Sequence, residues 1–515
     1  MAVALFAWNA SLLYLPGQGF TYLLQFGTLQ HDRYLPELKA ASHFEIPNSM
    51  GYDSQWYAQI AMRPRLGDPA LRRAVDGLSY RARRILFPVL AWALAGGDAV
   101  RAMNLFAVEN LVSWILLAVL LLRWFPMVSW GNFARWAAVL FSFGLVFSAA
   151  RALPDGPSLL LLAVGMALAE ARRPWLAAMV LGVSGLGKDT NVLFASGLAL
   201  PGRPGARPMA GWVARVALVL LPLAAWMVCL RAWLGPGDDV GARNFAAPFT
   251  GLARKLEDCA SLLAAGGRGP VPRLDLYVMV GLLAQFAFFA TRWRWRDPWW
   301  RVGACYAVLM VFLGDAVWEN YPSAAARVLL PMTLAFNIAV PRGRWWVILL
   351  VAGNLGVLSS LDISKPPGRE SFVVKGPGSL RINPRDGSAV EAVFGPRNWW
   401  IPEKNRWEFW RWNMGDATVA LRNPQPFTLE SVVTFSLRSD DRREAIVESG
   451  GKVLWRGILE PAQVLPVSLG EIDLPPGDTV LFFTSDRPPA YPGNGDARRL
   501  TFSVRGLEID LQGRR

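Results

Sequence analysis

Apolar runs closed by clusters of arginine dominate residues 1–360 and limit the folds that this chain can adopt. Several of these runs approach the ~20 residues that a helix needs to cross a bilayer. The pattern therefore predicts a polytopic α-helical membrane domain with about 11 spans. The expected spans are residues 1–16, 102–122, 134–150, 157–171, 175–187, 191–200, 211–234, 274–291, 302–317, 326–340 and 345–358.

Arginines are distributed unevenly between the loops that join these runs. With a cytoplasmic N-terminus, every short arginine-rich loop falls on the cytoplasmic side, which is the positive-inside pattern. These inner loops hold Arg123, Arg135, Arg172, Arg173, Arg203, Arg207, Arg292, Arg301, Arg342 and Arg344. The outer loops hold Asp53, Asp155, Asp189, Asp238, Asp239, Asp315 and Glu319. The asymmetry predicts that the C-terminus lies outside the membrane.

The composition excludes several other classes of function. The formal net charge is +14, but the arginines cluster between apolar runs, so the charge reflects membrane topology and not nucleic-acid binding. The three cysteines are far apart and lack metal-ligand spacing, which leaves no disulfide framework. With only two histidines, a histidine-based metal site or catalytic triad is not expected. We expect no cofactor, and a divalent metal is possible but not indicated.

The composition changes at about Lys365, where apolar runs become short and alternate with polar residues. Examples are Ser431–Phe435 and Thr479–Phe483, and turn signals such as Leu474–Asp478 separate the runs. Many short strands with regular turns predict a β-sandwich or jelly roll. We therefore expect a transmembrane domain over residues 1–360 and an all-β domain over residues 368–515, outside the membrane.

A tryptophan-rich run lies in this β region, between Asn398 and Trp412. Aromatic faces stack on sugar rings, so one interpretation is a carbohydrate-binding surface. The other interpretation is that these residues form the sandwich core or dock on the membrane interface, where tryptophan is common. The sequence leaves both interpretations open.

A polar stretch over residues 17–84 forms the expected first outer loop. Its segment Pro69–Arg84 is rich in arginine and carries scattered apolar residues, which predicts an interfacial amphipathic helix. The apolar segment Ile85–Ala95 is too short to span a bilayer, so we expect a re-entrant or hinge helix there.

Within this loop, the stretch Gly51–Ala61 places Asp53 among aromatic and amide side chains. No glycine-rich phosphate loop, metal-ligand spacing or serine–histidine pair surrounds it. A lone carboxylate in this setting suits a general base acting on a hydroxyl. Tyr52, Gln55 and Tyr57 would then contact the substrate in a sugar subsite. The alternative is a surface loop in which Asp53 caps a helix.

Gly182–Asp189 nearly matches the P-loop pattern of nucleotide-binding proteins. However, Asp189 stands where Ser or Thr would hold magnesium, and the motif ends an apolar run instead of following a strand. We therefore expect no nucleotide site. Lys188 is either an interfacial lysine that reaches water or a lysine at the outer face that binds the phosphate of an anionic lipid.

Arg327 lies at the outer start of an expected span, where it breaks the positive-inside trend. It therefore needs an anionic partner. A phosphate suits its forked donors, and the alternative is a salt bridge to Asp315 or Glu319. Asp155 lies on the same side, where it either caps a helix or provides a second acid near the site.

Two motifs of the first loop resemble those of GT-C-type membrane glycosyltransferases. Gly51–Tyr57 (GYDSQWY), followed by Tyr80–Pro88 (YRARRILFP), is similar to a bacterial branch with the pattern G-Y-D-G-Q-F-Y then Y-R-x-x-R-I-L-x-P. This branch is distantly like the GPI mannosyltransferases, and Ser54 replaces its common glycine. The resemblance covers about residues 1–360. It implies that Asp53 deprotonates the acceptor hydroxyl, that the donor is a polyprenyl-phosphate-linked sugar, and that the product is a cell-surface glycopolymer.

The sequence therefore predicts an inverting membrane glycosyltransferase of the bacterial cytoplasmic membrane, with an active site on the outer face. Its expected partners are a polyprenyl-phosphate-linked sugar, a glycan or lipid acceptor and membrane lipids, and no nucleic acid. Lys188 and Arg327 would bind the donor phosphate. The alternatives are a lipid-linked sugar transporter or flippase, and a non-enzymatic glycopolymer assembly protein. A transporter would favour charges near the bilayer midplane, whereas the charges here lie at the ends of the expected spans.

Overall fold

The computed structural model describes residues 2–46, 49–200, 206–235, 241–264, 270–318, 323–363, 372–395, 397–404, 408–492 and 498–515. Two compact units make up the chain. The helical unit comprises residues 1–26, 30–44 and 51–365, and the β unit comprises residues 27–29, 45–50 and 366–515. The main division falls between Lys365 and Pro366, in the interval between the two predicted domains.

The first part of the helical unit consists of short helices and one long one. Its helices are α1 (Ala2–Ser11), η1 (Thr21–Leu24), α2 (Pro36–Ala40), α3 (Ser54–Met62), α4 (Pro69–Ala74), α5 (Leu78–Arg81), η3 (Ala82–Arg84), α6 (Leu86–Leu94), α7 (Ala99–Leu120) and η4 (Leu121–Arg123). The same stretch of chain also holds η2 (Thr28–Arg33) and the two-residue strands β1 (Phe26–Gly27) and β2 (Glu45–Ile46), of which residues 27–29 and 45–46 belong to the β unit.

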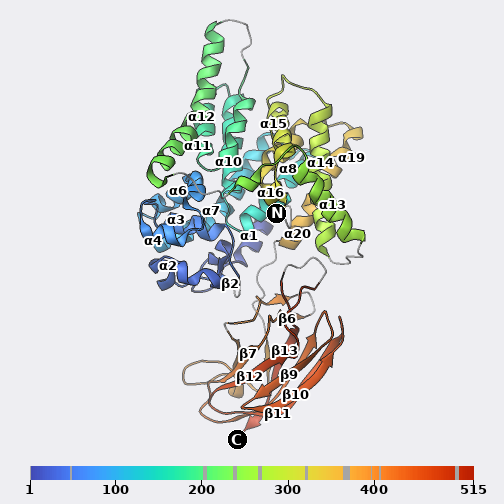
Figure 1. Ribbon diagram of the computed structural model, residues 1–515. Coiled ribbons are helices and arrows are strands. Elements are labelled where there is room, and N and C mark those ends of the chain that lie inside the picture. The colour runs from blue at the N-terminus through green and yellow to red at the C-terminus, as the bar shows by residue number, and fades with distance from the viewer. Residues whose placement is uncertain are drawn as a thin grey trace. The chain divides into compact units, whose positions relative to one another are not determined.

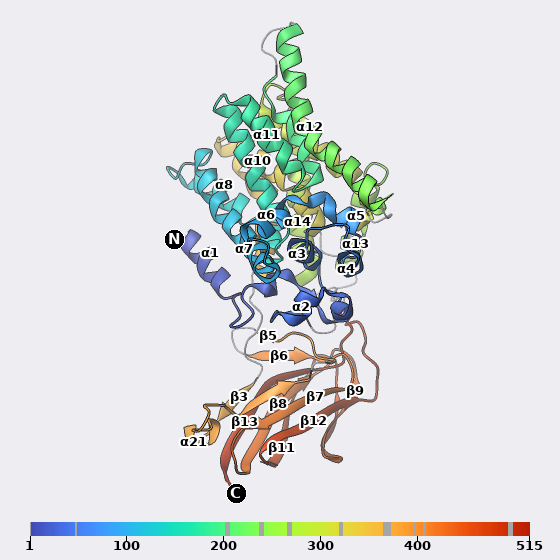
Figure 2. The same ribbon diagram turned by 90° about the vertical axis from the view of Figure 1, so that its left-hand side faces the viewer.

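The remaining helices of this unit are longer and more apolar. They are α8 (Trp130–Leu140), α9 (Phe143–Ala150), α10 (Asp155–Glu170), α11 (Pro174–Gly185), η5 (Asp189–Gly197), α12 (Ala206–Leu234), η6 (Ala242–Asn244), α13 (Thr250–Ala264), α14 (Pro270–Thr291), α15 (Pro298–Phe312), α16 (Asp315–Trp318), α17 (Ser323–Val328), α18 (Leu330–Ala339), η7 (Arg344–Trp346), α19 (Val347–Gly353) and α20 (Gly356–Ile363). Figures 1 and 2 show α10, α11 and α12 packed side by side.

Among the described residues, three helices are long and apolar enough to cross a membrane: Ala99–Arg123, Met209–Leu234 and Leu274–Thr291. A fourth span results if α8 and α9, which meet at a 46° bend, count as one. The apolar helices agree with a membrane protein, but they do not confirm the expectation of about 11 spans, because most of the other expected spans are short or broken helices.

Backbone chemistry explains two of these shorter helices. The expected span 326–340 is divided into α17 and α18, because Pro331 lies at the start of α18 and lacks the N–H that would continue the preceding helix. The expected span 191–200 is a 3₁₀ segment, Asp189–Gly197. Its tighter winding suits a connector better than a membrane-spanning helix.

The predicted interfacial helix over Pro69–Arg84 is also wrong. Asp68 accepts a hydrogen bond from the backbone N–H of Ala70 and starts α4, but α4 ends at Ala74 in extended backbone at Val75. The apolar residues of this segment are buried inside the helical unit, where Val75 is 2% exposed. Their apolar side chains therefore contribute to a protein core and not to a membrane-bound face.

The glycines of the P-loop-like motif lie at contacts between helices, a role that was not predicted from the sequence. The motif spans the end of α11, and a Cβ at Gly182 would lie 2.6 Å from the carbonyl oxygen of Leu218 on α12. A Cβ at Gly187 would clash with the Phe87 ring. These glycines therefore permit close contacts between helices instead of surrounding a phosphate.

The β unit is a sandwich of two sheets, as predicted (Figures 1 and 2). Within the described residues, one sheet has the strand order β10-β9-β12-β7-β4 and the other β11-β8-β13-β6-β5, with β3 alongside β13. Their bounds are β3 (Val373–Lys375), β4 (Glu391–Phe394), β5 (Glu403–Lys404), β6 (Phe409–Trp412), β7 (Ala417–Asn423), β8 (Leu429–Arg438), β9 (Arg443–Ser449), β10 (Lys452–Leu459), β11 (Val464–Leu474), β12 (Gly477–Ser485) and β13 (Ser503–Arg514), with the helical turn α21 (Gly378–Arg381). Alternate residues of β8 are buried, which is the period-2 pattern that predicted the strands.

The tryptophan-rich run contributes to this sandwich core. Trp399 is fully buried and donates a hydrogen bond of 2.8 Å from Nε1 to the carbonyl oxygen of Thr418, and Trp412 is 6% exposed. Trp400 and Trp410 are half-buried, each with an arginine guanidinium over its ring. Trp407 lies outside the described residues. The core interpretation therefore holds for Trp399 and Trp412.

We expect residues 368–515 to fold when expressed alone. A piece of about 150 residues is large enough to bury a core, and the buried side chains of both sheets form one apolar cluster. Circular dichroism should show a β-rich spectrum, and thermal unfolding should be cooperative. A helical or disordered spectrum would show that this unit depends on the rest of the chain.

Candidate functional site

A cleft in the helical unit brings together ionisable side chains from distant parts of the chain. Its walls come from the start of α3, the α5–η3 segment, the N-terminus of α10, the start of η5, and α17. The empty volume is about 760 Å³. The ionisable residues that line it are Asp53, Tyr80, Arg84, Asp155, Lys188, Asp189 and Arg327. Four of these, Asp53, Asp155, Lys188 and Arg327, are predicted site residues.

Asp53 immediately precedes α3 but does not cap it. Its backbone is already helical (φ −50°, ψ −35°), and its carboxylate accepts no capping hydrogen bond. A capping residue has extended backbone and a side chain bonded to the helix N–H groups. Instead, the carboxylate lies 3.1 Å from Nη1 of Arg81 and is 33% exposed. Asp53 is therefore available to a molecule in the cleft.

Hydrogen bonds and aromatic rings fix the position of the Arg81 side chain. It donates two hydrogen bonds to Asp76, of 2.9 Å from Nε and 2.8 Å from Nη2, and its side chain is only 8% exposed. The rings of Tyr57 and Tyr80 lie beside its guanidinium, at 5.8 and 5.4 Å from the ring centroids. The guanidinium therefore presents a fixed positive charge to Asp53.

A buried ion cluster forms the floor of the cleft. The ammonium of Lys188 donates to Oδ1 of Asp155, and Nη1 of Arg327 donates to Oδ2 of Asp155 over 3.1 Å. Lys188 also donates to the carbonyl oxygen of Arg327 over 3.1 Å. All three residues are at most 8% exposed. The cluster joins α10, the start of η5 and α17 in one network.

The Asp155 carboxyl stays ionised in this cluster. Burial alone would raise the pKa of Asp155, but the positive charges of Lys188 and Arg327 outweigh burial, and the pKa lies well below its usual range. Asp155 is the first residue of α10, and its carboxylate accepts hydrogen bonds from Lys188 and Arg327. The carboxylate therefore belongs to the ion cluster that lines the cleft.

The position of Arg327 depends on a close approach of two helices. A Cβ at Gly144 of α9 would clash with the backbone of α17 at Ala326. Because glycine removes this clash, α17 lies directly against α9 and carries Arg327 towards Asp155. Of the two salt-bridge partners expected for Arg327, Asp315 pairs with Arg254 instead, and Glu319 lies outside the described residues.

Arg84 was not predicted as a site residue, yet it lines the cleft. Its Nη1 donates to the Tyr57 hydroxyl over 2.8 Å, and Asp189 lies 3.9 Å from its Nη2. Its Nε is buried and has no hydrogen-bond partner among the described residues. Arg84 is the second arginine of the Y-R-x-x-R-I-L-x-P pattern over Tyr80–Pro88, and this position is the sequence signal that points to it.

The predicted substrate contacts lie behind the cleft and not on its surface. Tyr52 accepts a hydrogen bond of 3.4 Å from Arg327, and Tyr57 accepts one from Arg84. Burial raises the pKa of Tyr57 against the opposing charges of Arg84 and Arg81, so its hydroxyl stays neutral. Gln55 is 1% exposed and accepts a hydrogen bond of 2.9 Å from Tyr34. Tyr52 and Tyr57 therefore orient the cations of the site, while Gln55 stabilises the first loop.

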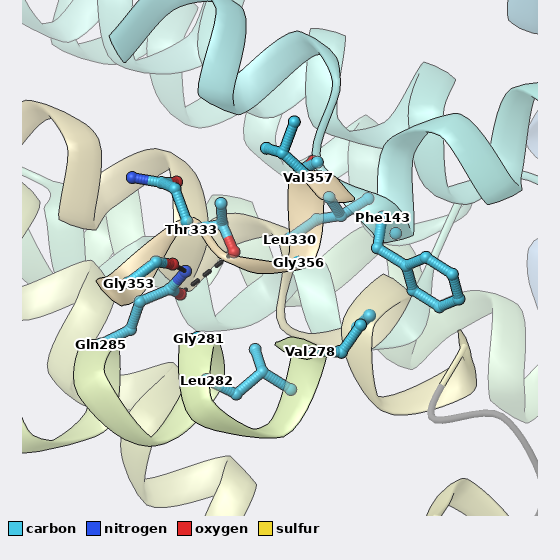
Figure 3. A pocket seen from close by; sticks show the side chains of 14 residues that line it. Phe143, Val278, Gly281, Leu282, Gln285, Leu330, Thr333, Gly353, Gly356 and Val357 are labelled. Carbon is cyan, nitrogen blue, oxygen red and sulfur yellow. Dashed lines mark hydrogen bonds between the residues drawn. The ribbon is translucent and has the colours of Figure 1, made fainter. Parts of the chain in front are cut away.

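A different cavity, between α9, α14, α18 and α20, has no ionisable side chain among the described residues that line it (Figure 3). Gln285 donates a 2.7 Å hydrogen bond to the carbonyl oxygen of Gly353 and accepts one of 3.1 Å from Thr333. The remaining lining is mainly apolar or glycine. The cavity therefore lacks groups for acid–base chemistry. No group of three or more metal-ligating side chains occurs among the described residues.

No family model matches this chain, and no curated protein matches it. The cryo-EM structure of the arabinosyltransferase EmbB from Mycobacterium smegmatis is similar to this chain at 10% identity and a TM-score of 0.27. The match covers 100% of this chain and 65% of EmbB, so the chain spans less than two thirds of the length of that protein. A TM-score of this size does not establish a shared fold.

Proposed function

We propose that this protein is a membrane glycosyltransferase in which Asp53 acts as the general base. The observation that carries the proposal is the state of the Asp53 carboxylate: it makes no helix cap, is one-third exposed (33%) and lines a cleft with three cationic side chains. A base needs an ionised oxygen that can reach the substrate, and the developing charge of a phosphate leaving group needs nearby cations. The cleft supplies both.

The reaction that fits this arrangement is a single displacement. The acceptor hydroxyl oxygen forms a bond to the anomeric carbon of the sugar while Asp53 takes the hydroxyl proton. The bond between the anomeric carbon and the phosphate oxygen breaks, and the lipid phosphate leaves with the electron pair. Because phosphate is a good leaving group, the site needs a base and a phosphate-binding cation more than a general acid.

Arg84 is the cation that we assign to the donor phosphate first. Lys188 and Arg327 share the Asp155 carboxylate at hydrogen-bond distance, whereas Arg84 faces Asp189 at 3.9 Å and retains an unpaired Nε. A planar guanidinium with free donors suits a phosphate. Lys188 and Arg327 then supply a more distant positive charge to the same group.

The proposed donor is a polyprenyl-phosphate-linked sugar that enters from the bilayer, and the acceptor is a glycan or lipid. We place the site on the outer face of a bacterial cytoplasmic membrane, because the short arginine-rich loops between the expected spans all fall on the opposite side. A transfer assay on membranes with several lipid-linked sugars tests the proposal directly. Sugar movement without transfer would favour a flippase, and glycan binding alone would favour an assembly protein.

Replacement of Arg84 by Gln should raise the KM for the lipid-linked donor about tenfold or more, because a hydrogen bond to a charged group contributes about 1.5–3 kcal/mol. The KM for the acceptor should change little. The matched control is Arg72→Gln, which removes an exposed arginine of the same loop that does not line the cleft. Equal donor KM values for the two variants would show that Arg84 does not bind the phosphate.

A further inference from the structure

A second cavity, which we call the α12 cavity, lies between the α5–η3 segment and the end of α12. Its lining includes Ser79, Arg83, Met227, Val228, Leu230 and Arg231, and its empty volume is about 860 Å³. Trp226 attaches this segment to α12, since its Nε1 donates a 2.8 Å hydrogen bond to the carbonyl oxygen of Ala82. The α12 cavity shares no lining residue with the cleft that contains Asp53.

Within the described residues, the polar side chains of the α12 cavity have no hydrogen-bond acceptor as a partner. Arg83 contacts the Tyr80 ring at 5.5 Å, and neither Arg83 nor Arg231 forms an ion pair within the described residues. The Ser79 hydroxyl is buried and has no hydrogen-bond partner among these residues. Two guanidinium groups and a hydroxyl at one cavity form a set of donors that suits a phosphate.

The other wall of the α12 cavity is apolar and belongs to a helix that can span a membrane. Met209–Leu234 meets the length and hydropathy requirements of a span, yet only 11% of its apolar window is buried. Near the cavity, Val228 is 70% exposed and Trp233 is 62% exposed. Arginine and tryptophan near the end of such a helix are typical of the level of lipid headgroups.

We propose that the α12 cavity binds a bilayer phospholipid with an anionic headgroup, such as phosphatidylglycerol. Arg83, Arg231 and the Ser79 hydroxyl bind its phosphate, and an acyl chain covers the exposed apolar face of α12. Basic pockets beside membrane-spanning helices bind such headgroups. A soluble phosphate would leave the apolar wall exposed, and an uncharged lipid would leave the arginines unpaired.

A phospholipid bound in the α12 cavity would also stabilise the conformation of the cleft that contains Asp53. Ser79 and Arg83 face the α12 cavity, whereas Tyr80 and Arg84 of the same segment line the cleft. A phosphate bound to Arg83 therefore restricts the segment that positions Arg84. This consequence rests on the proposed function, but the binding of the phospholipid does not.

The experiment measures lipid binding to the full-length protein without any transfer reaction. Detergent-purified protein is titrated with phosphatidylglycerol or phosphatidylcholine, and bound lipid is counted by native mass spectrometry. The double substitution Arg83→Gln/Arg231→Gln should weaken phosphatidylglycerol binding about tenfold or more and should leave phosphatidylcholine binding unchanged. Control variants Arg72→Gln and Arg215→Gln remove one positive charge each from the same loop and the same helix, outside the cavity, and should bind like wild type.

Four results would overturn the proposal. The double variant could bind phosphatidylglycerol as wild type does, or the controls could lose as much binding as the double variant. Inorganic phosphate could compete as strongly as the phospholipid, which would make the site one for a soluble anion. Polyprenyl phosphate could displace phosphatidylglycerol at equal concentration, which would make the cavity part of the donor site. Circular dichroism of each variant confirms that the comparison is between folded proteins.

Discussion

Replacement of Asp53 by Asn is expected to abolish sugar transfer and to leave the fold and donor binding intact. The amide keeps the shape of the side chain but cannot take the proton of the acceptor hydroxyl. Loss of a general base costs about 10²–10⁴-fold in rate. Arg81 keeps its two hydrogen bonds to Asp76 in the variant, so no buried charge is left unpaired. The measurements are the transfer rate, donor affinity and thermal stability in detergent.

Asp76→Asn is the matched control for this experiment. Asp76 shares Arg81 with Asp53, at 2.8 Å and 3.1 Å respectively, but it does not line the cleft. Its substitution weakens the fixation of Arg81 and leaves the proposed base in place, so we expect only a modest loss of rate. If both variants lose transfer equally, Asp53 contributes to transfer by orienting Arg81 and not by accepting a proton.

Transfer by Asp53→Asn within about threefold of wild type would contradict the assignment, because the loss of a general base is much larger. A parallel fall in activity and thermal stability would instead assign Asp53 a structural role. Neither result would affect the apolar helices, whose existence depends on composition and length.

The sequence alone could not show whether Asp53 caps a helix or leaves its carboxylate free. The motif placed a carboxylate beside the start of a helix, and both a cap and a free base fit that pattern. Only the backbone angles and the absence of a capping bond separate them. Capping depends on whether one residue is extended or helical, and the local sequence of Asp53 permits both.

The partner of Arg327 could not be predicted for a different reason. The sequence indicated that an arginine on the acidic side needs an anion, and the nearest acids along the chain were Asp315 and Glu319. The acid that binds it, Asp155, is 172 residues away. Such pairings follow from the packing of α9, α10 and α17, which depends on close contacts such as the one at Gly144. The need for a partner was readable from the sequence, but its identity was not.

The sequence predicted some of the helices and strands but not where each one ends. Composition identified the apolar segments, and period-2 alternation identified several strands of the β sandwich, because both signals are local. The division at Pro331 was also visible in the sequence, since proline cannot continue a helix from the preceding turn. The apolar composition of residues 326–340 predicted a single span because the residues on both sides of Pro331 are hydrophobic.

Replacement of Asp155 by Asn is expected to destabilise the helical unit strongly. Lys188 and Arg327, with side chains 6% and 9% exposed, would lose their shared counter-ion inside the protein. Removing one partner of a buried ion pair costs about 3–5 kcal/mol, because the remaining charge is buried without compensation. The apparent unfolding temperature in detergent should fall, and Asp189→Asn is the matched control. Asp189 is 33% exposed and lies 3.9 Å from Arg84, so its loss should cost less than about 1 kcal/mol.

The pH dependence gives an independent measurement of the same cluster. Because the pKa of Asp155 is depressed in the folded protein, its stabilising contribution is present above its unfolded pKa of about 4. The contribution is lost as the pH falls from there through the depressed folded value. The difference in stability between wild type and Asp155→Asn should therefore narrow as the pH falls below about 4.

The stability and activity of Asp155→Asn together decide which carboxylate is the base. Both oxygens of Asp155 already accept hydrogen bonds from Lys188 and Arg327, so neither is directed to a substrate hydroxyl. We therefore expect the loss of transfer in this variant to follow its loss of folded protein. If Asp155→Asn remained as stable as wild type and still lost all transfer, while Asp53→Asn stayed active, the general base would be Asp155. The cluster would then be catalytic machinery, and Asp53 would serve only to orient Arg81.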